Sequence, residues 1–231
     1  MRFMKDAQIL IEEIRLSLVF KNAEPIPEDF LLKLLTEKGY EVIDEIPKRI
    51  GTATFGIERI NIARRGNCQV LYDPRMGMLG IAGNRPDHVV KEVNNIEAIL
   101  EENGYDLSQE IKFYEMLFQG RIFMKSKFKP LEKIGSFIGL DKFSKFKDVM
   151  GEDVAPLDIR FYPKREMKTA ENLRSILKWF DVHIYPYIEN PSYYAVNIVF
   201  RDPDSATVKS FSENILSKVS EIFNIIIGGD S

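Results

Sequence analysis

The chain has 231 residues, 45% of them hydrophobic and 29% charged, which suits one large globular domain or two of about 100 to 120 residues. Its formal net charge of -3 excludes a whole-molecule attraction to nucleic acid or to anionic membranes, so any such attraction requires a local basic patch. The only cysteine is Cys68, which excludes an intramolecular disulfide and a cysteine-based zinc site.

The sequence also bears on the cellular location. Residues 1–13 lack the apolar core and the small-residue cleavage site of a signal peptide, and no apolar run approaches the roughly 18 residues that span a bilayer. We therefore expect a soluble, cytoplasmic protein. Its richness in Lys, Glu and Ile, with a single Cys, favours a thermophilic source.

The first half of the chain predicts two helices and five strands. The expected order is a strand at 13–20, a helix from Pro27 to Gly39, strands at 40–46, 52–63, 67–72 and 77–82, and a helix from Pro86 to Gly104. Glycine ends both helices because it takes the left-handed C-cap conformation without steric cost. This half therefore reads β-α-β-β-β-β-α.

The second half predicts a similar series of elements with one difference. The expected order is a strand at 110–127, whose first part also fits a helix, a helix at 130–146, a strand at 157–162, a helix at 168–180, a hairpin of 182–188 with 193–200, and a last helix with Asp202 as N-cap and Pro203 at its first position. The helix at 168–180 takes the place of a strand.

The two halves share a spacing that indicates an internal duplication. Pro86-Asp87 and Pro203-Asp204, each following a hairpin, lie 117 positions apart, as do Pro74 and Pro191. We expect a first half at residues 1–108 and a diverged second half at 109–231, with a single continuous sheet as one possible arrangement.

The first half resembles the TATA-box-binding protein family, best over residues 13–128. Phe55 and Tyr72 lie 17 residues apart, as does the aromatic pair that this family wedges into a DNA base step. The turn at 73–77, the glycine-ended strand at 79–84 and the pair Gly104-Tyr105 are similar to the family's pattern. The resemblance implies an α+β saddle made of two pseudo-repeats of a curved antiparallel sheet, with helices on the convex face.

Three departures from that family limit what the resemblance implies. The family reads the minor groove with an asparagine near the start of each half's first strand, and residues 12–17 and 118–122 contain none. Ala170 stands where a second wedge aromatic, 17 residues before Tyr187, would be needed. TATA-specific recognition is therefore not expected.

Two sets of residues are candidates for contacts with nucleic acid. Alternation along the strand at 52–63 places Phe55, Arg59 and Asn61 on one face, and these with Tyr72 make a groove-facing set. The alternative is that Phe55 and Tyr72 are cross-strand neighbours in the core.

The second set lies in residues 120–147, which carry eight basic and two acidic residues. Arg121, Lys125, Lys127 and Lys129 would contact phosphates, because alternate residues of a strand point the same way. The alternative is a solvated strand edge, where lysines oppose sheet-to-sheet association.

No motif in the sequence indicates an enzyme. His88 and His183 are isolated, no serine lies in a nucleophile elbow, and no carboxylate pair is identified, so we expect no catalytic residue, metal or cofactor.

The leading hypothesis is a non-enzymatic DNA- or RNA-binding protein, associated with transcription. The alternative is a protein-interaction module on the same scaffold, using the concave sheet or the tyrosines of the late hairpin (Tyr185, Tyr187, Tyr193 and Tyr194). A third option is a small-ligand sensor between the halves. The sequence leaves the oligomeric state open.

Overall fold

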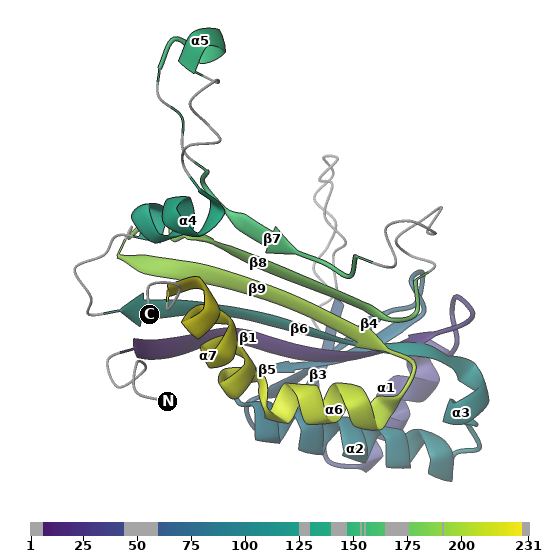
Figure 1. The fold of residues 1–231 in the computed structure, drawn as a ribbon. Coiled ribbons are helices and arrows are strands. Elements are labelled where there is room, and N and C mark those ends of the chain that lie inside the picture. Colours follow the sequence, from purple (N-terminus) through teal and green to yellow (C-terminus); the bar gives the residue numbers. More distant parts are fainter. Residues whose placement is uncertain are drawn as a thin grey trace.

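The computed structural model describes residues 7–43, 60–124, 130–139, 147–152, 154, 156–164, 176–190 and 192–227. Within these residues, nine strands form a single antiparallel sheet, and helices α1, α2, α6 and α7 gather on one side of it (Figure 1). The expected α+β class is confirmed.

The bounds of the elements are as follows. The strands are β1 (Ala7–Phe20), β2 (Glu41–Val42), β3 (Ile60–Arg65), β4 (Cys68–Asp73), β5 (Met78–Gly83), β6 (Ile111–Met124), β7 (Ile159–Phe161), β8 (Trp179–Pro186) and β9 (Tyr193–Asp202). The helices are α1 (Glu28–Glu37), α2 (Pro86–Glu102), α3 (Leu107–Glu110), α4 (Pro130–Ile138), α5 (Lys147–Met150), α6 (Ser205–Glu213) and α7 (Ile215–Ile227).

The two longest strands, β1 and β6, lie next to each other at the middle of the sheet. The strand order is β2-β3-β4-β5-β1-β6-β9-β8-β7, so each central strand is flanked by one hairpin, β4–β5 or β8–β9. The β1–β6 ladder runs from Ala7 opposite Met124 to Phe20 opposite Ile111, with a bulge between Ile11 and Glu13. A Cβ atom on Gly120, which pairs with Ile11, would lie 2.7 Å from the Phe118 ring and 3.0 Å from the carbonyl oxygen of Leu10, so a larger residue does not fit there without a shift of its neighbours.

The core lies between the sheet and the helices. Ile14, Leu16 and Leu18 of β1 and Met116 and Phe118 of β6 are fully buried, because alternate residues of a strand point to the same face. Helices α2 and α6 lie side by side under these central strands (Figure 1).

Polar contacts join α2 to α6 beneath the central strands. Glu97 of α2 accepts a hydrogen bond from the Ser205 hydroxyl at 3.1 Å and forms an ion pair with Lys209 of α6. Since α2 packs on β1 and β5 while α6 packs on β6 and β9, these contacts tie the helices of one half of the sheet to those of the other.

A second buried polar cluster joins α2 to the start of the sheet. Glu92 of α2 is 9% exposed; it accepts a hydrogen bond from the Tyr40 hydroxyl at 2.8 Å and pairs with the Arg65 guanidinium at 3.1 Å. The same guanidinium lies 4.6 Å from the centre of the Tyr40 ring. Burial and the neighbouring carboxylate raise the pKa of the Tyr40 hydroxyl.

The structure differs from the predicted elements in four places. The one helix expected at the end of the chain is two helices, α6 and α7. β1 begins at Ala7, six residues before the predicted start at residue 13. Trp179 and Phe180 begin β8 instead of ending a helix. Asp204, not Asp202, caps α6: it accepts hydrogen bonds from the backbone of Ala206 and Thr207, while Asp202 is the last residue of β9. Residues 44–59 and 165–175 lie outside the described ranges.

Replacing Glu92 by Ala should lower the free energy of unfolding by about 2 to 4 kcal/mol, because it leaves the buried Tyr40 hydroxyl and part of the Arg65 charge without a partner. Urea denaturation followed by circular dichroism measures this. The matched control is Glu102→Ala in the same helix, where an exposed pair with Lys38 is lost and a change within about 0.5 kcal/mol is expected. Equal effects of the two substitutions would contradict the role given to Glu92.

Candidate interaction face of the sheet

The face of the sheet opposite α2 and α6 carries polar and aromatic side chains. We call it the open face. Strand register aligns its residues in rows that cross β1, β6, β9 and β8: one row is Ser17, Glu115, Arg201 and Trp179, and the next is Arg15, Leu117, Val199 and Asp181. A third row is Glu13, Gln119, Asn197, His183 and, on β7, Arg160.

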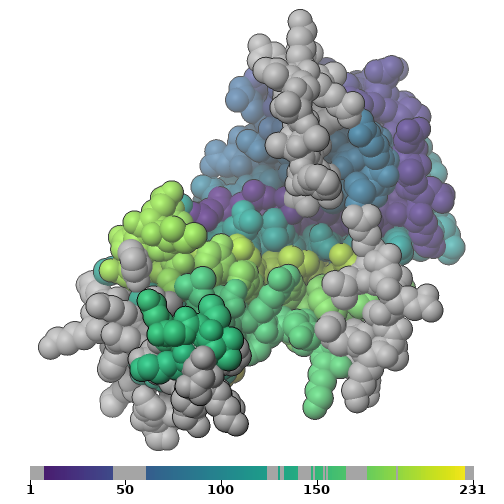
Figure 2. All heavy atoms as spheres, turned by 90° about the horizontal axis from the view of Figure 1, so that it is seen from above, coloured from purple at the N-terminus to yellow at the C-terminus, as the bar shows by residue number. Residues whose placement is uncertain are grey.

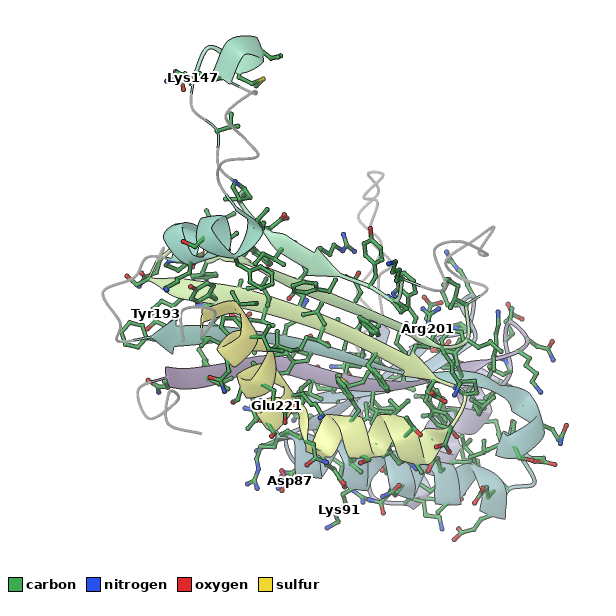
Figure 3. All side chains as sticks on the ribbon, in the orientation of Figure 1. Asp87, Lys91, Lys147, Tyr193, Arg201 and Glu221 are labelled. Carbon is green, nitrogen blue, oxygen red and sulfur yellow. The ribbon has the colours of Figure 1, made fainter. Side chains whose placement is uncertain are left out.

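The open face differs between the two ends of the sheet. On β5 it presents Gly80 and Ala82, and a Cβ atom at Gly80 would lie 3.4 Å from the Arg15 side chain and 3.1 Å from the Ser17 hydroxyl. The Arg15 side chain therefore lies flat along β5 and is almost buried. The larger side chains belong to β6, β7, β8 and β9, with Tyr193 and Arg201 at the two ends of β9 (Figure 3). Figure 2 views the molecule from above the sheet as it is drawn in Figure 1.

Four arginines along the open face each contact a carboxylate. The pairs are Arg15 with Glu13 at 3.0 Å, Arg160 with Asp181 at 2.9 Å, Arg201 with Glu115 at 2.6 Å, and Arg121 with Glu12. Hydrogen bonding to Asp181 raises the pKa of the Arg160 guanidinium, which stays charged over the whole physiological range. These arginines thus add little net positive charge to the face.

Aromatic rings lie among these pairs. Tyr162, which follows β7, stacks on Trp179 with ring centres 6.2 Å apart and planes 5° apart. His183 and Tyr185 are in contact at 4.6 Å, and the Tyr185 hydroxyl accepts a hydrogen bond from Asn197 at 3.3 Å.

The aromatic surface continues toward the β8–β9 turn. The Arg121 guanidinium lies 4.0 Å from the centre of the Tyr187 ring, and Phe123 packs on Tyr193 with centres 5.0 Å apart. Tyr194 points to the other side and is 2% exposed. One side of the tyrosine hairpin is thus core, and the other side is surface.

Tyr72 belongs to the core and not to a groove-facing set. It is 1% exposed, its hydroxyl donates to the carbonyl oxygen of Ile26 and accepts from the Ile26 backbone N–H at 3.3 Å, and burial raises its pKa. It pairs with Leu79 on the helix side of the sheet. Of the two interpretations of Tyr72 drawn from the sequence, packing in the core fits this position, because the chain before α1 needs a partner for its backbone.

The other residues selected from the sequence have different positions. Asn61 of β3 lies opposite Leu71, on the reverse side of the sheet from Tyr72, and its buried Oδ1 has no hydrogen-bond partner among the described residues. Arg121 is on the open face. Phe55, Arg59, Lys125, Lys127 and Lys129 lie outside the described residues, so their roles stay predictions.

The rows of the open face were not predicted from the sequence, because they depend on strand register. Arg160 lies opposite His183, and Trp179 lies opposite Arg201 and against Tyr162, although these partners are well separated in the sequence. The alternation of Asp181, His183 and Tyr185 along one strand could have indicated this polar face. The prediction of a helix up to Phe180 obscured the alternation.

Comparison with protein-family models and with curated protein sequences finds no match for this chain. None of the described helices combines the length and the hydropathy that a membrane span requires. The described residues also contain no group of three or more His, Cys, Asp or Glu side chains placed to hold a metal ion.

Replacing Tyr72 by Phe should lower the free energy of unfolding by about 1 to 2 kcal/mol, because the Ile26 backbone groups lose their buried partner. Tyr162→Phe on the open face is the control and should change stability by less than about 0.5 kcal/mol. Urea denaturation of both variants distinguishes them. A negligible effect of Tyr72→Phe would return Tyr72 to the candidates for a surface contact.

Proposed function

We propose that this chain is a non-enzymatic protein-interaction module that binds a protein partner through the open face. The observation that carries the proposal is the pairing of Arg121, Arg160 and Arg201 with carboxylates among aromatic side chains.

Paired charges and aromatic rings are the chemistry of a protein interface. Tyr, Trp and Arg are enriched among the residues that dominate binding between proteins. Binding to a phosphate backbone instead draws on cations that are not already neutralised, because its free energy comes largely from counterion release. On the open face the described guanidinium groups already have carboxylate partners.

For the scaffold, we infer a saddle of two related halves similar to the TATA-box-binding protein fold. The strand order supports this, since β5 and β9 flank the central pair and each is the second strand of a hairpin. Each of these hairpins leads into a helix near a Pro-Asp pair, at Pro86 for α2 and at Pro203 for α6. Nucleic-acid recognition does not come with this scaffold, since fold alone does not fix function.

Binding of single-stranded nucleic acid is the second candidate. Aromatic rings on the exposed face of an antiparallel sheet can stack on bases, and the Tyr162–Trp179 pair has that chemistry. Lys125, Lys127 and Lys129, together with Arg121, would supply the phosphate contacts under this hypothesis.

The proposal predicts that open-face aromatics are needed to retain a partner. The double variant Tyr162→Ala/Tyr185→Ala should weaken binding at least tenfold, since truncating interface aromatics typically costs 1 to 2 kcal/mol or more each. Partners recovered by affinity purification from the source cells would be identified by mass spectrometry and titrated by calorimetry. Lys91→Ala, on the outer side of α2 away from the sheet (Figure 3), is the control and should bind like the parent protein. Equal binding by all three proteins would contradict the proposal.

Nucleic-acid binding provides the second test. Fluorescence anisotropy with double-stranded DNA, single-stranded DNA and RNA, at about 50 and 200 mM salt, should show no micromolar binding of the parent protein. Micromolar binding that falls steeply with salt, and that is lost in Lys125→Glu/Lys127→Glu/Lys129→Glu, would replace the protein-interaction proposal with the nucleic-acid one.

A further inference from the structure

A pocket of about 330 Å³ opens on the helix side of the sheet, away from the open face. Its walls come from β7, β8 and β9 and from α4, α6 and α7, and we call it the apolar chamber. Among the described residues, its lining is Phe137, Phe161, Phe180, Val182, Ile198, Phe200, Phe211, Ile222, Ile225 and Ile226, with Lys218 as the one polar member.

The chamber has a buried floor and an accessible rim. Ile198 and Ile226 are almost fully buried, whereas Phe180, Phe137 and Ile225 are 38%, 40% and 66% exposed. These exposed side chains leave an apolar concave surface in contact with water. Covering this surface with an apolar ligand would be favourable.

Aromatic pairs form two of the chamber's walls. Phe200 of β9 and Phe211 of α6 are stacked with ring centres 4.0 Å apart, and Phe137 of α4 meets Phe161 of β7 edge to face at 6.2 Å. Because each pair joins a helix to a strand, the walls are held by packed secondary structure, as in a preformed ligand site.

A polar depression adjoins the chamber. It has a volume of about 650 Å³ and shares Phe200, Phe211 and Lys218 with the chamber. Its remaining lining residues are mostly polar: Asp204, Ala206, Thr207, Ser210, Asn214, Ser217 and Glu221. An apolar compartment thus meets a polar one at Lys218.

Lys218 stands at this boundary. Its ammonium nitrogen lies 3.4 Å from a Glu221 carboxylate oxygen, and both side chains are largely solvent-accessible. An exposed pair at that distance contributes little stability, so the ammonium group is available to a second carboxylate. Alkyl stems of lysine also pack readily along apolar surface while the charged end stays in water.

We propose that this site binds a single-chain amphiphile with an anionic head, such as a free fatty acid. Its tail enters the apolar chamber and its carboxylate lies beside Lys218, facing the polar depression. The chamber volume is at the lower end of the range for small-molecule sites and holds on the order of ten water-sized groups, which suits a chain of medium length. The proposal does not depend on the open face binding a partner.

Decanoate, 1-decanol and acetate are the probes, each titrated against the full chain by displacement of 8-anilinonaphthalene-1-sulfonate and, for decanoate, by calorimetry. Decanoate should bind at one site with a dissociation constant on the order of 10⁻⁵ to 10⁻⁴ M, and acetate should not bind. Lys218→Gln should lower the affinity for decanoate about two- to fivefold and leave the affinity for decanol unchanged, because only the anion contacts the ammonium group.

Ile225→Glu places a carboxylate at the exposed rim and should weaken decanoate at least tenfold without disturbing the fold. Ile188→Glu is its matched control, since Ile188 is 89% exposed on the β8–β9 turn and outside the chamber, and it should bind decanoate like the parent protein. The proposal would be overturned if decanoate showed no saturable binding, or if the two substitutions had equal effects on decanoate binding. A dimer detected by analytical ultracentrifugation and dissociated by Ile225→Glu would also overturn the proposal, because a second copy of the chain would then cover the chamber. Binding to phosphatidylglycerol vesicles without binding to decanoate would also overturn it.

Discussion

The antiparallel pairing of β1 with β6 is the constraint on which the rest of the structure depends. Each strand has 14 residues, and their ladder crosses the middle of the sheet. β1 carries the β4–β5 hairpin on its other edge, and β6 carries the β8–β9 hairpin. Without the central ladder, the sheet would fall into two groups of strands, and the rows of side chains that make up the open face would not exist.

The same pairing separates two chemically different faces. Alternate residues of β1 and β6 point into the helix layer and are mostly apolar, while the residues between them include the polar side chains of Glu13, Arg15, Ser17, Glu115, Gln119 and Arg121. On the helix side, α2 and α6 meet over the central strands through Glu97 and its contacts with Ser205 and Lys209. The proposed amphiphile site and the proposed interaction face thus lie on opposite sides of one sheet, and each can be altered without touching the other.

Local patterns predicted the elements well, whereas the candidate site depended on register. The glycine stop after α1, the Pro86 start of α2 and the late hairpin follow from rules that act within a few residues. Tyr72 could not be placed from sequence, because an aromatic residue on a strand fits either face until its partner, the Ile26 backbone, is known. Trp179 was assigned to a helix on apolar spacing alone, although its neighbours in the sheet are Arg201 and Tyr162.

Tryptophan and cysteine each occur once in the chain, and together they allow a direct test of the central ladder. Trp179 is the only tryptophan and lies beyond β6, while Cys68 is the only cysteine, is buried, and lies in β4 on the far side of β1. Equilibrium urea unfolding would be followed by Trp179 fluorescence and, in parallel, by the fraction of Cys68 that a thiol reagent modifies rapidly. If the β1–β6 pairing makes one cooperative sheet, the two curves share a midpoint and a slope. Exposure of Cys68 at a clearly different urea concentration from the loss of Trp179 signal would contradict that account.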